Sequence, residues 1–129
     1  MTELTQEQRG NLEQLAAYLR SGNLQAEFDM GGYSDHCGSV GCAVGHGPYA
    51  GIPKNEEELW HSYSDRVFVE SIRAESWMFD ADWELVDNTP EGAAARIEWF
   101  LEHGVPDNWV QQLEGDAPLC YSTENTNDD

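Results

Sequence analysis

The densest group of chemically reactive side chains lies in a glycine-rich segment. His36, Cys37, Cys42 and His46 fall within the eleven residues HCGSVGCAVGH. Zinc prefers cysteine and histidine ligands, and Cys42 and His46, four residues apart, would share one face of a helix. The spacing C-x4-C-x3-H is uncommon in zinc sites, and the adjacent side chains of residues 36 and 37 tend to diverge. We therefore predict a structural turn into a short buried helix without a cofactor, with zinc on these four residues as the alternative.

The same segment could supply a cysteine nucleophile. A thiolate at Cys37 would be stabilised if a helix begins there, and a neighbouring histidine could act as its base. Cysteine hydrolases usually take their histidine from a distant part of the chain, for which His61 and His103 are the candidates. The glycines match neither G-x-x-x-x-G-K-[ST] nor G-x-G-x-x-G, which argues against a nucleotide site. The alternative function is therefore a small metal- or cysteine-dependent enzyme centred on residues 36–46.

Acidic residues dominate the charge of the chain, with 25 Asp and Glu against 6 Lys and Arg and a formal net charge of −19. Residues 1–54 carry 6 acids and 3 bases (net −3), whereas residues 55–129 carry 19 acids and 3 bases (net −16). Such a field repels nucleic acid and anionic lipid and attracts basic protein surfaces. We predict that acids of the second part form a continuous negative face that binds a partner. Its candidate residues are Glu56, Glu57, Glu58, Asp80, Asp82, Glu84, Asp87 and Glu91.

Two segments carry complete helix signals. Residues 5–20 begin with a Thr–Gln capping box, repeat apolar residues with helical spacing and end before Gly22, which can close a helix in the left-handed conformation. Residues 90–103 begin with Thr-Pro, in which threonine caps the helix and proline takes its first position, and they end before Gly104. We expect both segments to bury one apolar face.

Three further segments are predicted to be helical over part of their length. Residues 55–69 start with a capping residue, Asn55, and carry an apolar stripe, although the VFV sequence at 67–69 could form a short strand instead. Residues 76–86 combine aromatic side chains with acids, which indicates a partly helical segment anchored in the core. Residues 107–113 are predicted to form one or two further helical turns.

These signals predict a mainly α fold, a compact single-domain arrangement of about four to five helices with a glycine-rich loop and room for one short β element. We expect residues 1–115 to form the acidic globular domain and residues 116–129 to form a polar acidic tail, disordered at residues 122–129. A domain of this length can bury one hydrophobic core. The side chains predicted to meet in that core are Leu15, Leu19, Trp83, Ile97, Phe100 and Leu101.

The chain shows no signal for a membrane or for secretion. It has no apolar run near the roughly 20 residues needed to span a bilayer, and its start, MTELTQEQRG, lacks the pattern of a signal peptide. Its three cysteines are an odd number, which argues against a disulfide framework. We expect a cytoplasmic protein with reduced thiols.

The order of several short motifs resembles a family of small uncharacterised proteins of phages and bacteria. That family has an FDM segment, a CGT-x-x-C-x-x-G-like motif and a Trp-Phe-Trp segment. The matching elements, in chain order, are Phe28-Asp29-Met30, Cys37-Gly38-Ser39-Val40-Gly41-Cys42-Ala43-Val44-Gly45-His46, Trp60 with Tyr63-Ser64, Trp77, Phe79 and Trp83, Thr89-Pro90 with Ala94-Ala95-Arg96-Ile97, and Gly104-Val105-Pro106. Ser39 stands where such proteins often have threonine. The resemblance covers about residues 12–106 and implies a shared architecture and a phage or bacterial setting, but no activity.

Charge, size and setting together predict a non-enzymatic interaction protein. Its partner would present a basic surface, such as the nucleic-acid groove of a DNA- or RNA-handling enzyme, and the protein would act as a nucleic-acid mimic of the anti-restriction or anti-CRISPR type. Direct binding of nucleic acid is not expected, because two polyanions repel.

Overall fold

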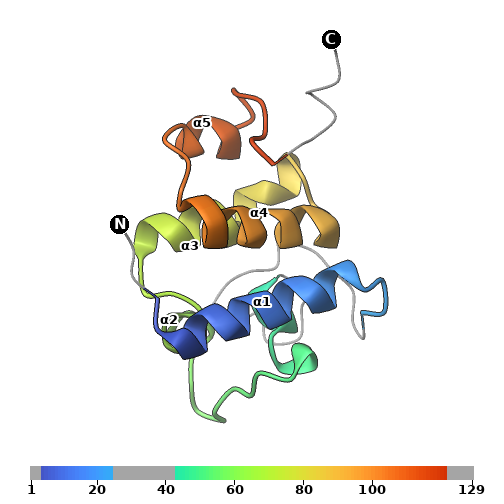
Figure 1. Cartoon of the computed structure of the whole chain (residues 1–129), viewed down its shortest axis with the longest axis vertical. Helices are drawn as coiled ribbons and strands as arrows, with labels where there is room; N and C mark the ends of the chain where they lie inside the picture. The colour runs from blue at the N-terminus through green and yellow to red at the C-terminus, as the bar shows by residue number, and fades with distance from the viewer. Residues whose placement is uncertain (1–3, 25–42, 122–129) are drawn as a thin grey trace.

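The computed structural model describes residues 4–24 and 43–121, and within these ranges the chain is helical and contains no strand (Figure 1). None of these helices is long and apolar enough to cross a bilayer. The mainly α fold predicted from the sequence is therefore confirmed. The elements in chain order are α1 Gln6–Arg20, η2 Val44–His46, η3 Pro48–Ala50, α2 Trp60–Val67, α3 Ile72–Phe79, η4 Ala81–Leu85, α4 Pro90–His103 and α5 Trp109–Leu113, where η marks a 3-10 helix.

Helix α1 forms as its local signals predict. The Thr5 side chain accepts a hydrogen bond from the Gln8 N–H, and the Gln8 side chain accepts one from the Thr5 N–H, which completes the capping box. The helix ends before Gly22, whose φ of +77° is the left-handed conformation that favours glycine. Its inner face is a continuous apolar stripe of Leu12, Leu15, Ala16 and Leu19.

Helix α4 lies beside α1, and their contact is the most extensive between any two of the described helices (Figure 1). Thr89 caps its first turn, accepting a hydrogen bond from the Gly92 N–H, and Pro90 takes the first helical position, as predicted. At the far end the Gly104 N–H donates to the Phe100 carbonyl, and Gly104 has a φ of +80°.

The predicted helix over 55–69 is shorter than expected, because α2 begins only at Trp60. The expected capping partners do meet, but inside a turn: the Asn55 N–H donates to Glu58 Oε1, and the Glu58 N–H donates to the Asn55 carbonyl. Glu58 is held there by Arg66, which binds both carboxylate oxygens at 2.7 and 2.8 Å. The VFV sequence at 67–69 forms no strand, since Phe68 and Val69 continue from α2 and donate their N–H groups to Ser64.

Helix α3 and the 3-10 helix η4 form the aromatic anchor predicted for 76–86. Trp77, Phe79 and Trp83 are buried, and the Trp83 indole N–H donates to the Trp77 carbonyl. Leu85 does not belong to this anchor, because its side chain is 85% exposed. In a 3-10 helix, residues three positions apart lie on the same face. This repeat, and not the number of apolar residues in the segment, therefore decides which side chains of η4 face inward.

Five of the six predicted core side chains are buried together with the aromatic residues of α2 and α3. Leu15, Leu19, Trp83, Ile97 and Phe100 are all 5% exposed or less. Leu101 is the exception, since it only packs partly against the core. Successive residues of a helix lie about 100° apart, so when Phe100 faces the core Leu101 reaches only its edge.

The packed part of the chain extends past the boundary predicted at residue 115. Leu119, Cys120 and Tyr121 are half-buried against the core, and the Tyr121 ring lies edge-on to Trp77 and Trp83. The tail predicted to be disordered at residues 122–129 lies outside the described residues.

Candidate functional site

The described part of the glycine-rich segment is a buried turn. Residues 43–47 are all buried, and η2 runs from Val44 to His46. The His46 ring lies between the rings of Tyr18 and Tyr49, with centroid distances of 5.7 and 5.8 Å, and its Nδ1 is 3.4 Å from the Tyr18 hydroxyl. These contacts give His46 a structural place in the core.

The alternative zinc site falls mostly outside the described residues. His36, Cys37 and Cys42 lie in the segment 25–42, so the predicted convergence with His46 stays a prediction. Within residues 4–24 and 43–121, no group of three or more His, Cys, Asp or Glu side chains has the arrangement of a metal site.

The first group of predicted partner-binding acids occupies the turn before α2. Glu56 and Glu57 are exposed there, and no Lys or Arg of the described part lies within ion-pair distance of them. Glu58 differs, since its carboxylate is held by Arg66 and is largely covered. Hydrogen bonding to Arg66 lowers the pKa of Glu58 to about 2. Glu58 is therefore a structural acid, and only its two neighbours are open to a partner.

The second group lies between α3 and the first turn of α4. Asp82 and Glu91 are exposed, while Asp80 is half-buried and caps η4, its Oδ1 accepting from the Asp82 N–H at 2.8 Å. Glu84 belongs to η4, but its side chain lies outside the described part. Asp87 is half-buried, and its carboxylate accepts hydrogen bonds from the hydroxyls of Tyr121 and Thr89.

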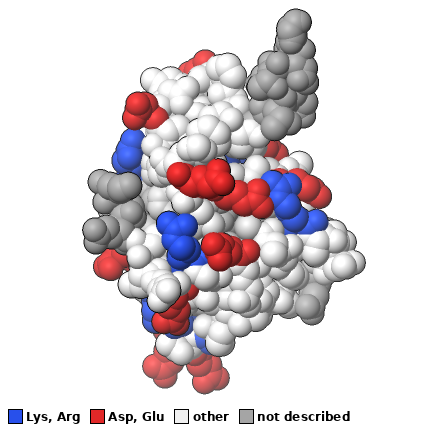
Figure 2. Space-filling model, in the orientation of Figure 1, with Lys and Arg blue, Asp and Glu red and all other residues white. Residues whose placement is uncertain are grey.

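The two groups do not form one cluster. Figure 1 places the turn before α2 at the lower end of the molecule and η4 in its upper half. On the face drawn in Figure 2, acidic side chains stand in separate groups, with neutral surface between them and Lys or Arg beside some of them. This face gives no support to the predicted continuous negative surface.

Asp87 is part of a buried polar cluster built around Arg96. The Arg96 side chain is fully buried, and its guanidinium carbon lies 4.1 Å from the centroid of the Trp83 ring. Arg96 Nη1 donates to the Tyr121 hydroxyl at 2.9 Å, and that hydroxyl donates to Asp87 Oδ2 at 2.7 Å. Arg96 Nη1 and Asp87 Oδ2 are themselves 3.7 Å apart.

Burial controls the ionisation of this cluster. Desolvation lowers the pKa of Arg96 and raises that of Tyr121. The Asp87 carboxylate also accepts from the Thr89 hydroxyl at 2.7 Å and lies so close to Gly92 that a Cβ there would collide with it. The cluster therefore connects the start of α4 to Tyr121. It was not predicted from the sequence, because nothing in the sequence around Arg96 indicates that its side chain is buried.

A second structural feature that the sequence did not predict is a pair of carboxyl groups between α2 and α3. Asp65 lies on α2 and Glu75 in the first turn of α3, and Glu75 Oε2 accepts from the Ser64 hydroxyl at 3.3 Å. Burial, followed by hydrogen bonding to Asp65 and its charge, raises the pKa of Glu75 to about 8. Glu75 therefore holds a proton near neutral pH and can donate it to Asp65.

This raised pKa predicts that stability falls as pH rises. Because Glu75 binds its proton more tightly in the folded chain, its stabilisation is complete below the ordinary glutamate pKa and is lost as pH increases to about 8. Glu75→Gln should remove this loss. Because Glu75 is only half-buried, solvent screening reduces the expected effect to roughly 1–2 kcal/mol between pH 5 and pH 8.5. Urea unfolding of both proteins at the two pH values measures it.

Glu70→Gln is the matched control, since Glu70 is an exposed neighbour that also raises the pKa of Glu75. It should keep most of the pH dependence of the parent chain. Identical pH dependence in the parent chain and in Glu75→Gln would contradict the assignment of the proton to Glu75.

Comparisons with known proteins supply no relative for this fold or for these sites. The chain matches no protein-family model, no curated protein and no solved structure at a significant level.

Proposed function

We propose that this chain is a non-enzymatic binding protein whose exposed carboxylates dock on a basic surface of a partner protein. The observation that carries the proposal is the excess of exposed acids without an ion-pair partner among residues 4–24 and 43–121. A surface of this kind attracts a basic partner and accelerates the encounter with it. These acids are Glu7, Glu13, Glu56, Glu57, Glu70, Asp82, Glu91, Asp107, Glu114 and Asp116.

The few bases of the chain do little to neutralise this surface. Arg20 binds Glu98 at 2.7 Å, Arg66 binds Glu58, and Arg96 is buried beside Asp87. Half of the six Lys and Arg residues are thus matched with acids of the chain itself. The remaining carboxylates keep their charge for contacts with another molecule.

The finer form of the proposal concerns the class of partner. A DNA- or RNA-handling enzyme presents a basic groove that is shaped for phosphates, and an acidic protein of phage or prophage origin would inhibit such an enzyme by occupying that groove. The residues proposed to make the contact are Glu56, Glu57, Asp82 and Glu91, which are the predicted acids that remain exposed and unpaired. Glu58 and Asp87 are excluded, because Arg66 and the Arg96 cluster hold them.

Binding to defined basic enzymes tests the proposal. The purified chain is titrated against a restriction endonuclease and against a guide-loaded Cas9 by biolayer interferometry. We expect binding to at least one of them that weakens at least tenfold between 50 and 300 mM NaCl, because exposed charges are screened over that range. Duplex DNA carrying the enzyme's site should compete. Salt-dependent binding that DNA does not displace would overturn the nucleic-acid mimic, and no binding to either enzyme at 50 mM NaCl would do the same.

Charge-matched double variants separate a binding surface from net charge alone. Glu56→Gln with Glu57→Gln removes two charges from the first group, and Asp82→Asn with Glu91→Gln removes two from the second. Each should weaken binding roughly fivefold. The control carries Glu13→Gln and Glu114→Gln, which change the net charge equally on α1 and at the end of α5, and it should lose less than twofold. Equal losses in all three proteins would show that no particular acids are used.

A further inference from the structure

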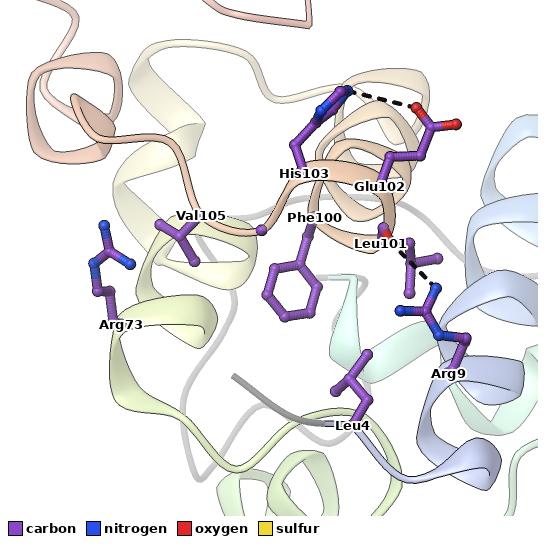
Figure 3. A pocket seen from close by; sticks show the side chains of 9 residues that line it. Leu4, Arg9, Arg73, Phe100, Leu101, Glu102, His103 and Val105 are labelled. Atoms are coloured by element: carbon purple, nitrogen blue, oxygen red, sulfur yellow. Dashed lines mark hydrogen bonds and ion pairs between the residues drawn. The ribbon is translucent and has the colours of Figure 1, made fainter. Parts of the chain in front are cut away.

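A cavity of about 310 Å³ opens where the start of α1, the start of α3 and the end of α4 come together. Figure 3 shows the Phe100 ring in its centre, with Leu4 on one side and Val105 on the other. Pockets of this size hold small organic molecules and are usually lined by apolar side chains with a few polar groups that orient the ligand. None of the acids proposed to contact a partner, Glu56, Glu57, Asp82 and Glu91, lines this cavity.

Two arginines lie on opposite sides of this apolar floor. Figure 3 shows Arg73 of α3 beyond Val105 and Arg9 of α1 beside Leu101. Arg9 Nη1 donates to the Leu101 carbonyl at 3.2 Å, which fixes its guanidinium at the rim. Arg73 is exposed and makes no hydrogen bond or ion pair with the described part of the chain.

Two arginines at one cavity are unexpected in a chain that is so strongly acidic. With 25 acids and 6 bases, a carboxylate partner is easily supplied to every Lys and Arg. Arg9 and Arg73 nevertheless line one cavity and have no carboxylate at ion-pair distance among residues 4–24 and 43–121. Glu102 also lines the cavity, but its Oε1 is 3.5 Å from His103 Nε2, and Figure 3 shows this pair on the side of α4 away from the Phe100 ring.

We propose that this cavity binds a small organic carboxylate with an apolar body. The body would cover Phe100, Leu4 and Val105, and the carboxylate would accept hydrogen bonds from the guanidinium group of Arg73, while Arg9 on the opposite side adds positive potential. Arginine suits this role because its planar fork matches the two oxygens of a carboxylate. The apolar floor adds affinity that a simple inorganic anion could not gain.

Hexanoate is the probe, and hexan-1-ol is its neutral counterpart of equal chain length. Each is titrated into the full chain labelled with ¹⁵N, and the amide shifts are followed by NMR. We expect saturable shifts from hexanoate at Leu101, Gly104, Val105 and Arg73, with a Kd at least fivefold lower than that for hexan-1-ol. Chloride or acetate at the same concentration should not reproduce these shifts.

Two charge-matched variants test whether the carboxylate binds at Arg73. Arg73→Gln removes a base that makes no hydrogen bond or ion pair within the described chain, so the melting temperature should change little, and the Kd for hexanoate should rise about threefold to tenfold. Lys54→Gln also removes one positive charge, but Lys54 does not line the cavity, so this variant should bind hexanoate with a Kd within twofold of the parent value. Equal affinity for hexanoate and hexan-1-ol, equal losses in the two variants, or shifts confined to residues outside the cavity would each overturn the proposal.

Discussion

Arg96→Met is expected to lower the free energy of unfolding by about 3–5 kcal/mol, which is a large part of the stability of a domain of this size. Methionine nearly matches the length of the arginine stem but carries neither charge nor hydrogen-bond donors. Tyr121 would lose its donor at 2.9 Å, and the Asp87 carboxylate would lose the positive charge that compensates its partial burial. The contact between the guanidinium and the Trp83 ring would also disappear.

Urea unfolding followed by circular dichroism measures this loss. Arg20→Met is the matched control, because Arg20 also binds a carboxylate at 2.7 Å but both side chains are nearly half exposed, so its loss should stay below about 1 kcal/mol. Adding Asp87→Asn to Arg96→Met should recover part of the stability, since the uncompensated charge is then gone. A loss below about 1 kcal/mol in Arg96→Met would show that the cluster contributes little to folding.

Helices α1 and α4 were predictable because their signals are local. A capping residue, its partner three positions on and an apolar stripe all lie within a few turns of each other, so no distant contact is needed to define the element. Thr5 and Thr89 cap the helices they were expected to cap, and Gly22 and Gly104 end them with positive φ.

The start of α2 was not predictable in the same way. Asn55 and Glu58 have the spacing of a capping box and do form its hydrogen bond, but Arg66 holds the Glu58 carboxylate at the turn and the helix begins at Trp60. The spacing of Asn55 and Glu58 therefore fits a turn closed by these bonds as well as it fits the start of a helix. Leu59, which precedes α2, is exposed although it stands four residues before the buried Tyr63, a spacing that in a longer helix would put both on one face.

The candidate sites depend even more on contacts between distant residues. The carboxyl pair joins Asp65 and Glu75 from two helices, and the arginine cavity joins Arg9 to Arg73 across the fold. Neither pair shows a motif, because the residue types are common and the spacing carries no periodicity. The excess of acidic over basic residues is plain from the sequence. It favours a basic partner, but it does not identify which surface of this chain would contact that partner.

Phe100→Ala is expected to destabilise the fold by about 3–5 kcal/mol, because it removes a large buried ring from the core. Phe100 is 5% exposed, and it belongs to the same core cluster as Leu15 and Ile97. The neighbouring backbone is fixed by the α4 hydrogen bonds, so the fold cannot easily collapse into the space. In a domain of ordinary stability this loss brings the folded state close to its unfolding midpoint at 37 °C.

Leu101→Ala provides the contrast within the same turn of α4. The sequence predicts both residues as core members, but Leu101 only packs partly against the core, so its truncation should cost about 1 kcal/mol. Urea unfolding of the two variants under the same conditions compares them directly. Because both changes shorten an apolar side chain on the same helix, helix propensity cannot account for a difference of several kilocalories. Equal losses would mean that Leu101 contributes as much to the core as Phe100 does, which would contradict their different burial.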